Sequence, residues 1–316
     1  MRRVALIYNP ASGQHSWRRH ADIDKALIVL RKAGVEARAH ETIAPGSAGV
    51  LAAEAVRRGC DAVLACGGDG TVHEVLQSLV GTTVALGVVP FGTANALASN
   101  LGLRSSPARV VRKLLTALPV RISVGQISYR DETGATGSRF FTVAAGVGAD
   151  AVFLSRLDPT LKRRIGYILY IIEAFRLWAT HSFPLFEAAF VESGSAQPRV
   201  EQISQLLAVR IRDFGGVLHN LVPGATLHKN GLRLVAFKTR SRLRYFRFLI
   251  AVVFGRQSFS REIELLDAVS VECRLCKGTL PRVYAEADGE LLGDLPVRIE
   301  IVPQAVTLLI PPNARP

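Results

Sequence analysis

The chain has 316 residues, with 39 Lys and Arg against 26 Asp and Glu and a formal net charge of +13. A typical domain has about 100 to 200 residues, so we expect two domains, and a hydrophobic share of 49% excludes a largely disordered chain. The basic surface is expected to attract polyanions such as nucleotide phosphates, nucleic acid or anionic lipid headgroups.

The four cysteines are too few for a disulfide framework, and the apolar segment Val4–Tyr8 is too short for a signal peptide. We therefore expect a reducing, cytoplasmic location. The apolar run at 248–254 has about a third of the roughly 20 residues that a membrane-spanning helix needs, so no transmembrane segment is expected.

The first third of the chain alternates short β-rich runs with helical patterns, which predicts a parallel sheet covered by helices. Expected strands are 4–8, 35–39, 62–65 and 84–89. Expected helices are 16–32, 47–58, 71–80, 93–101 and 108–118.

Longer β-type stretches follow from about residue 120, which predicts a β-rich second domain. Expected strands there are 121–129, 140–145, 205–211, 231–238 and 268–275. Helices are expected at about 161–179 and 243–254, and a final hairpin is expected from 297–301 and 305–310.

The strongest motif is Gly67-Gly68-Asp69-Gly70-Thr71, which follows one predicted strand and opens a helix. Backbone N–H groups of such a turn can bind phosphate oxygens, and its three glycines permit close approach. Asp69 would repel phosphate unless a divalent cation or a transferable proton lies between them, so the motif indicates phosphoryl chemistry. A plain glycine turn capped by Asp69 or Thr71 is the structural alternative.

Two further turns share this pattern, at Pro90–Asn95 (PFGTAN) and at Asn9–Gly13 (NPASG), and each follows a predicted strand. The carboxyl ends of parallel strands lie on one sheet edge, where ligands bind, so we predict a nucleotide cleft there. Neither a Walker A nor a Rossmann glycine motif follows any of these strands, which argues against P-loop NTPases and dehydrogenases.

These segments resemble a known family. GGDGT with the following Val72–Val75, the NPASG turn and PFGTANALA are similar to the diacylglycerol kinase catalytic domain shared by sphingosine, ceramide and bacterial lipid kinases. The resemblance continues through Gly146–Ala151, a G-x-G-x-D-A segment, through the glycine turn Asp213–Gly216, and through the late DGE motif Asp288–Glu290. It therefore covers nearly the whole chain in order.

The resemblance implies an α/β N-terminal domain, with a parallel sheet similar to phosphofructokinase and NAD kinase, and a C-terminal β-sandwich. We expect a nucleotide-binding domain at 1–120, a β-rich lipid-binding domain at 121–296, and a hairpin at 297–316 that can pack back on the first domain. ATP and Mg²⁺ are the implied cofactors. By resemblance, the residues expected to contact the nucleotide or its magnesium are Asn9, Ser12, Gly67, Gly68, Asp69, Gly70, Thr71, Gly92, Thr93 and Asn95.

Phosphate transfer to a lipid hydroxyl requires a magnesium ion at the phosphates and a carboxylate that orients or deprotonates the hydroxyl. Asp69 and Glu290 are the two candidates. We assign Glu290 as the base and Asp69 as the organiser of magnesium and phosphate, and the reverse assignment stays open. Without the resemblance, Asp288-Gly289 would be interpreted as a simple hairpin turn.

One segment departs from the family pattern. Many bacterial members carry an acidic structural metal site in the second domain, at a segment that here reads 223–231. The usual Asp is Asn230, and Lys229 precedes it. A hard cation prefers carboxylate oxygens, so these two residues argue against the site and leave Asp213 with a structural role.

A basic and aromatic segment predicts contact with an anionic membrane surface. Its arginines Arg240, Arg242, Arg244 and Arg247 alternate with Leu243, Tyr245, Phe246 and Phe248. Asp150 is a further candidate for lipid contact, and the basic rim of the helix at 161–179 is another, with core packing as its alternative. No helix-turn-helix, RNP or zinc-finger pattern supports nucleic-acid binding.

The predicted function is ATP-dependent transfer of the γ-phosphate to a hydroxyl of a membrane lipid, diacylglycerol-like or sphingoid, by a peripherally bound enzyme. One alternative is NAD kinase-like phosphorylation of a soluble dinucleotide. Another is a non-catalytic, nucleotide-gated lipid-binding protein. The NPASG turn, the DGE motif and the basic aromatic segments favour a lipid over a dinucleotide, and the presence of both Asp69 and Glu290 favours catalysis.

Overall fold

The computed structural model describes residues 1–13, 16–131, 133–149, 151, 182–195, 197–214, 221–256, 259, 261–276, 282–312 and 314. The chain divides into two compact units. The first comprises Met1–Val124, Asp213–Gly216 and Pro303–Pro316, and the second comprises Gly125–Arg212 and Val217–Val302. Strands β5 (Leu118–Arg130) and β15 (Glu290–Ile310) each contribute residues to both units.

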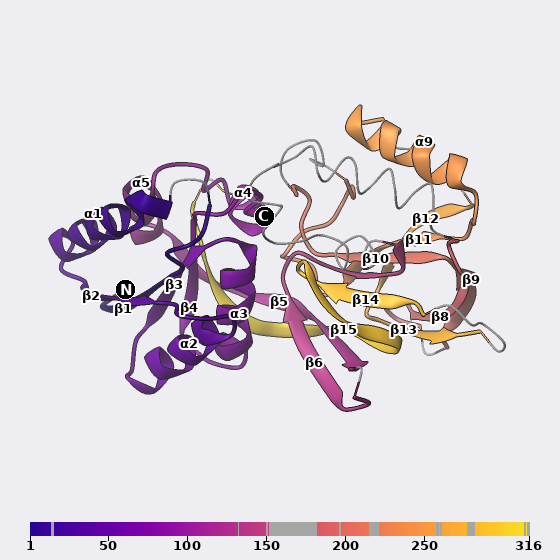
Figure 1. Ribbon diagram of the computed structural model, residues 1–316, viewed down its shortest axis with the longest axis horizontal. Coiled ribbons are helices and arrows are strands. Elements are labelled where there is room, and N and C mark those ends of the chain that lie inside the picture. The colour runs from indigo at the N-terminus through magenta and orange to yellow at the C-terminus, as the bar shows by residue number, and fades with distance from the viewer. Residues whose placement is uncertain are drawn as a thin grey trace. The chain divides into compact units, whose positions relative to one another are not determined.

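The first unit is a parallel sheet covered by helices (Figure 1). The end of β15 is followed across the sheet by β4 (Ala85–Pro90), β3 (Ala62–Gly67), β1 (Arg3–Tyr8) and β2 (Glu36–Glu41). All pairings among these strands are parallel. β3 is buried at every position, as expected for a strand with both faces covered.

Helices lie on both faces of this sheet. They are α1 (Arg19–Lys32, preceded by the 3₁₀ turn η1 at Ser16–Arg18), α2 (Ser47–Arg57), α3 (Asp69–Leu79), α4 (Ala96–Asn100) and α5 (Pro107–Leu115). α1 packs beside α5 on one face and α2 beside α3 on the other (Figure 1). α4 begins later than the predicted residue 93 because Asn95 has a φ of 49°, which a right-handed helix does not allow.

The second unit is built from antiparallel strands. They include β6 (Thr136–Phe141), β7 (Ala144–Val147), β8 (Phe186–Val191), β9 (Arg199–Ile203), β10 (Gln205–Val209), β11 (Leu232–Phe237), β12 (Ile263–Ala268), β13 (Ser270–Leu275) and β14 (Tyr284–Ala287). Their pairing order is β9-β8-β13-β15-β14-β7-β10-β11-β12, and β6 pairs with β5. The core includes Phe141, Phe186, Phe190, Leu206 and Leu234. The predicted fold class, α/β followed by a β-sandwich, is confirmed.

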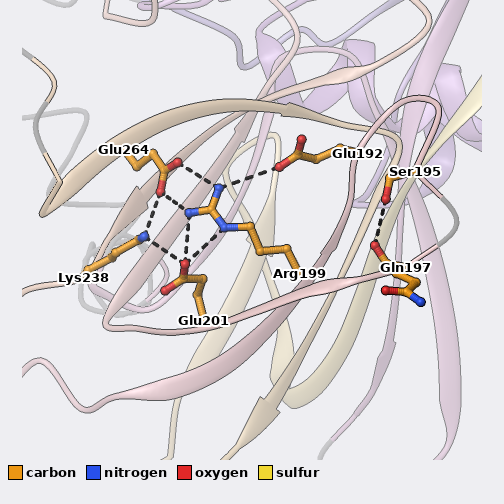
Figure 2. Close-up of polar contacts among 7 residues, drawn as sticks. All are labelled: Glu192, Ser195, Gln197, Arg199, Glu201, Lys238 and Glu264. Atoms are coloured by element: carbon orange, nitrogen blue, oxygen red, sulfur yellow. Dashed lines mark hydrogen bonds and ion pairs between the residues drawn. The ribbon is translucent and has the colours of Figure 1, made fainter.

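An ion-pair network joins the two ends of this strand order. Figure 2 shows Arg199 and Glu201 of β9 with Glu264 of β12 and Lys238, the residue after β11. The Arg199 guanidinium donates to both oxygens of Glu264, at 2.9 and 2.7 Å, and Lys238 Nζ lies 2.8 Å from Glu264 Oε2 and 3.2 Å from Glu201 Oε1. Because β9 pairs with β8 and β12 pairs with β11, side chains rather than a backbone ladder link these ends of the described sheet.

Helix α9 (Arg242–Val253) joins β11 to β12 on the periphery of the second unit (Figure 1). It matches the helix predicted at 243–254. Among the described helices, none combines the length and the apolar character that crossing a membrane demands. The helix predicted at 161–179 lies outside the described residues.

The predicted C-terminal hairpin is wrong, because β15 passes through both of its halves as one strand. Residues 297–300 pair with β13, whereas Thr307 and Leu308 pair with β4. Gln304 has a φ of 43°, so the strand bends at this position without reversing. The first half pairs with β13 in the second unit and the second half pairs with β4 in the first unit, so the two halves do not pair with each other.

The run predicted as one strand at 268–275 is also divided. β12 ends at Ala268 and β13 begins at Ser270, and the N–H of the intervening Val269 donates to the carbonyl of Val191 at 2.8 Å. The chain therefore leaves β11 and joins β8 at this point.

Candidate active site

Three glycine turns lie at the carboxyl ends of adjacent strands in the first unit. NPASG follows β1, GGDGT follows β3, and PFGTAN follows β4. Backbone hydrogen bonds extend the sheet into them, since Asn9 N–H donates to Cys66 O at 3.2 Å and Phe91 N–H donates to Gly67 O at 2.8 Å. The structure thus brings the three predicted phosphate-type turns to one sheet edge.

The GGDGT and PFGTAN turns approach each other so closely that side chains are excluded. A Cβ added at Gly92 would lie 2.6 Å from the Cα of Gly68. A Cβ at Gly67 would lie 2.2 Å from Thr71 Oγ1. Glycine at position 92 is therefore required by the close approach of the two backbones, whatever ligand the turns bind, whereas glycine at position 67 leaves room for the Thr71 side chain of the same turn.

Asp69 connects these two turns. Its Oδ2 accepts a hydrogen bond from the N–H of Asn95 at 2.9 Å, and its Oδ1 accepts one from the N–H of Ala96 at 2.7 Å. The carboxylate thus satisfies backbone donors at the start of α4, a different helix from the one that its own turn opens, and the N-cap of α3 has no side-chain hydrogen bond.

Asn95 holds the PFGTAN turn together from within. Its Oδ1 accepts from Gly92 N–H at 2.8 Å, and its Nδ2 donates to Gly92 O at 2.6 Å. The N–H groups of Gly92, Asn95 and Ala96 are therefore all engaged inside the protein. Among the predicted site residues, Gly70 and Thr93 are exposed and accessible to a nucleotide, whereas Thr71 is buried.

Arg19 ties the NPASG turn to the PFGTAN turn, and sequence reasoning missed it. It is almost fully buried at the start of α1, donates from its guanidinium to the carbonyl of Ser12, and lies 3.8 Å from the centre of the Phe91 ring. Burial lowers the pKa of Arg19. Asn9 shapes the same turn, because its Oδ1 accepts from Ala11 N–H at 2.9 Å. A basic residue in a helix gives no local sign of such burial.

In the second unit, the DGE motif forms a tight β-hairpin between β14 and β15. Asp288 and Gly289 have φ values of 47° and 90°, as a two-residue primed turn requires. The Asp288 carboxylate accepts hydrogen bonds from the N–H groups of Thr142, Val143 and Ala144 at 2.9 to 3.0 Å. The hairpin interpretation of Asp288-Gly289 is therefore confirmed, and Glu290 follows as the first residue of β15.

The G-x-G-x-D-A segment lies beside the DGE motif, because β7 pairs with β14 through Gly146 opposite Glu286. Gly148 has a φ of 117° and packs against the backbone of Ser204, where a Cβ would meet the carbonyl oxygen at 2.9 Å. Asp150 lies outside the described residues. Asp69 and Glu290 belong to different units.

Two family models match the chain in sequence order. The Diacylglycerol kinase catalytic domain matches residues 3–127, and the YegS C-terminal NAD kinase beta sandwich-like domain matches residues 142–310. The chain belongs to the diacylglycerol kinase family. The resemblance inferred from the motifs is thereby confirmed, and membership identifies the chain as a phosphotransferase of the lipid kinase type.

Curated relatives match the chain over nearly its whole length, and solved structures share its fold. The chain is 25% identical to the diacylglycerol kinase of Bacillus subtilis over 299 residues, covering 94% of this chain and 92% of that one. It is 29% identical to that of Mycobacterium tuberculosis over 317 residues, covering 98% and 95%. A Bacillus anthracis diacylglycerol kinase structure shares the fold with a TM-score of 0.71 at 18% identity, covering 99% and 98%. Yeast NADH kinase complexed with NADH shares it with a TM-score of 0.51 at 11% identity, covering 97% and 82%.

The segment 223–231, where the sequence departs from the acidic pattern expected by resemblance, is bound by a buried arginine. Arg210 is only 1% exposed, and its guanidinium donates to the carbonyls of Leu227 at 3.1 Å, Lys229 at 2.9 Å and Gly231. Burial lowers the pKa of Arg210 to about 10. Three carbonyl oxygens of this segment are thus bound to the guanidinium cation of Arg210, and the segment carries Lys229 and Asn230 where a carboxylate was expected. The residues present do not fit a divalent metal.

Proposed function

We propose that the protein transfers the γ-phosphate of ATP to a hydroxyl group of a diacylglycerol-like or sphingoid lipid. The observation that carries the proposal is the pair of glycine turns that Asp69 joins, at the carboxyl edge of a parallel sheet, in a chain of the diacylglycerol kinase family. Ligands of open α/β sheets bind at this edge.

The proposed nucleotide site uses the three turns of the first unit. The phosphates lie against Gly67–Thr71 and the segment 92–95, with Asn9 and Ser12 at the neighbouring strand end. Mg²⁺ in such sites keeps several waters and takes one or two carboxylates plus phosphate oxygens. Asp69 fits that need, since its carboxylate lies where the GGDGT and PFGTAN turns meet. When bound, the ion would neutralise charge on the phosphates.

The proposed transfer needs one further carboxylate at the acceptor. Glu290 accepts the proton of the lipid hydroxyl while that oxygen forms a bond to the γ-phosphorus and the bond from phosphorus to ADP breaks. Asp69 then remains with the nucleotide. The reverse assignment, in which Asp69 takes the proton, is tested by the variants in the Discussion.

A lipid acceptor is held in a membrane, so the enzyme must bind the membrane surface to reach it. We propose peripheral attachment at the cytoplasmic face, supported by the excess of 13 basic over acidic residues and by the four free cysteines.

The experiment is transfer of radiolabel from γ-labelled ATP with Mg²⁺ to diacylglycerol, to sphingosine or to NAD, with the lipids in neutral detergent micelles. We expect label in a lipid product and none in the dinucleotide. Asp69→Asn and Glu290→Gln serve as controls for contaminating kinases. Label in NAD, or folded protein that labels no lipid, would overturn the proposal and favour the dinucleotide kinase or the non-catalytic binding protein.

A further inference from the structure

One face of α9 is fixed to the β-sandwich by aromatic packing. Tyr245, Phe248 and Val252 are buried at helical spacing. The Tyr245 ring stacks on Phe237 with 4.7 Å between centroids and 8° between planes, and its hydroxyl lies 2.8 Å from Ser204 Oγ. Phe248 meets Phe237 edge-on at 5.2 Å. These contacts set the rotation of the helix, so its opposite face points away from the sandwich.

The opposite face carries large apolar side chains. Leu243, Phe246, Ile250 and the C-cap residue Phe254 follow one another at spacings of three, four and four residues, which places them in one row along the helix. Their exposed fractions are 62%, 40%, 42% and 70%. Four of the twelve large hydrophobic side chains exposed in the described part of the chain lie in this row.

Positive charge surrounds the row and negative charge is absent from the segment. Residues 239–261 include six arginines and no Asp or Glu. Arg242 and Arg247 are exposed on either side of the row. Arg244 forms an ion pair with Glu262, so part of its charge is already neutralised.

We propose that this surface docks the protein on an anionic lipid bilayer. We define the α9 face as Leu243, Phe246, Ile250 and Phe254 with Arg242 and Arg247. The apolar row enters the boundary between headgroups and acyl chains, about 5–10 Å deep, while the arginines bind lipid phosphates. The inference rests on the proposed function, since a lipid kinase must reach an acceptor held in a membrane.

The side chains of this segment that are available for membrane contact differ from those expected from the sequence. Tyr245 and Phe248, expected from the sequence to belong to the membrane segment, are part of the core instead. Arg244, expected as a membrane contact, faces Glu262. The α9 face therefore excludes Arg244, Tyr245 and Phe248.

Two other kinds of partner fit the α9 face less well. A nucleic acid would attract the arginines but would leave the four apolar side chains in water. A protein partner would need an apolar patch rimmed by acidic residues. A bilayer with anionic headgroups offers both an apolar layer for the four side chains and negative charge for the arginines, so we infer that it is the partner.

The test measures cosedimentation with vesicles in the absence of ATP. Wild type is expected to bind vesicles of equal parts phosphatidylglycerol and phosphatidylcholine more tightly than pure phosphatidylcholine, and to lose affinity as salt rises. Leu243→Ser with Phe246→Ser and Ile250→Ser is expected to weaken binding more than about tenfold. Arg242→Ser with Arg247→Ser is expected to weaken it about fivefold per arginine, on anionic vesicles only.

Matched controls remove comparable groups elsewhere on the second unit. Val200→Ser with Leu275→Ser removes exposed apolar side chains, and Arg274→Ser with Arg298→Ser removes exposed arginines. Both are expected to bind as wild type does. Phe246→Trp adds a reporter that does not weaken the face, and brominated lipid should quench it far more than a Val200→Trp reporter.

Equal binding by the α9-face variants and wild type, or an unquenched Phe246→Trp on bound vesicles, would overturn the inference. Binding of duplex DNA that the arginine variants lose, with vesicle binding unchanged, would do the same. The kinase assay in neutral micelles needs no anionic surface. Lipid phosphorylation in micelles without α9-dependent vesicle binding therefore removes this inference alone, and the converse removes the proposed function alone.

Discussion

The carboxylate of Asp69 accepts a hydrogen bond from the backbone N–H of Asn95, 26 residues further along the chain, at 2.9 Å. Since the other oxygen accepts from Ala96, the residue that we expect at the magnesium ion also holds two turns of the nucleotide site together. Its structural and chemical roles cannot be separated by removing the side chain, and a variant of the same shape is needed.

Asp69→Asn is expected to impair ATP–magnesium binding and turnover together. The amide oxygen can accept one of the two N–H groups, but the NH₂ group must then face the other donor, which costs about 1–3 kcal/mol of folding free energy. The amide also cannot balance magnesium charge. Thermal unfolding and equilibrium ATP binding measure both effects. Lost turnover with full ATP affinity would identify Asp69 as the base.

Glu290→Gln is expected to lower turnover about 100-fold or more with little loss of ATP affinity. Glutamine keeps the size of the side chain but lacks the basicity that the attacking hydroxyl requires. Single-turnover kinetics in micelles, with ATP binding measured separately, provide the readout. A variant that mainly loses nucleotide would invert the assignment of the two carboxylates.

Gly92→Ala is expected to separate the two glycine turns and to weaken ATP binding by more than about tenfold, because the new Cβ would lie 2.6 Å from Gly68 Cα. Isothermal titration with ATP and Mg²⁺ measures the loss. Gly231→Ala is the control, since its nearest neighbour would be a carbonyl oxygen at 3.6 Å. Unchanged ATP affinity in the Gly92 variant would mean that the close approach of the turns is not needed for binding.

Sequence patterns correctly predicted the strands and turns whose conformation is set by residues adjacent in the sequence. Buried runs followed by glycine turns identified β1, β3 and β4 and the three turns after them. Links across long separations had no such signal: the partner of Asp69 is set by tertiary packing, and the burial of Arg19 runs against the usual exposure of arginine. The strand β15 was mistaken for a hairpin because its two halves pair with β13 and β4, which no local pattern reveals.

Arg199→Met is expected to destabilise the second unit at neutral pH, on the order of 1 kcal/mol for a partly exposed network. Hydrogen bonds from Arg199 lower the pKa of Glu201 and of Glu264 from the ordinary value of 4.5. A carboxyl group whose pKa is lower in the folded than in the unfolded protein stabilises the fold at pH values above its unfolded-state pKa. This stabilisation is lost as the pH falls through the folded-state pKa. The difference in Tm between variant and wild type should therefore be largest near neutral pH and vanish well below pH 4.5.

The control for this prediction is Arg298→Met. Its ion pair with Glu300, at 3.0 Å, joins two residues of the same strand on an exposed surface, and its loss should leave Tm nearly unchanged at every pH. A Tm difference for the Arg199 variant that stays constant down to low pH would mean that packing rather than charge links β9 to β12.

Arg210 is expected to make the second unit independent of divalent cations. Its guanidinium donates to the carbonyls of Leu227, Lys229 and Gly231, so Arg210→Met would leave one buried and two part-buried acceptors without their donor. A buried acceptor without its donor costs about 1–3 kcal/mol, and the two acceptors that water can reach cost less, so the loss of unfolding free energy should be about 2 kcal/mol or more. Arg233→Met, which removes a part-buried hydrogen bond to Pro223 and a partly exposed ion pair with Asp267, should cost less.

Chelation of divalent ions distinguishes stabilisation by the Arg210 guanidinium from stabilisation by a bound metal ion. Wild type should keep its Tm when EDTA replaces Mg²⁺ or Ca²⁺ in the absence of nucleotide. Arg210→Ala combined with Asn230→Asp removes the guanidinium and adds a carboxylate beside the same carbonyls, and this double variant should gain Tm as Mg²⁺ or Ca²⁺ is added, because ligand binding to the folded state stabilises it. A fall in the Tm of wild type on chelation would show that a metal ion stabilises the second unit in spite of Arg210.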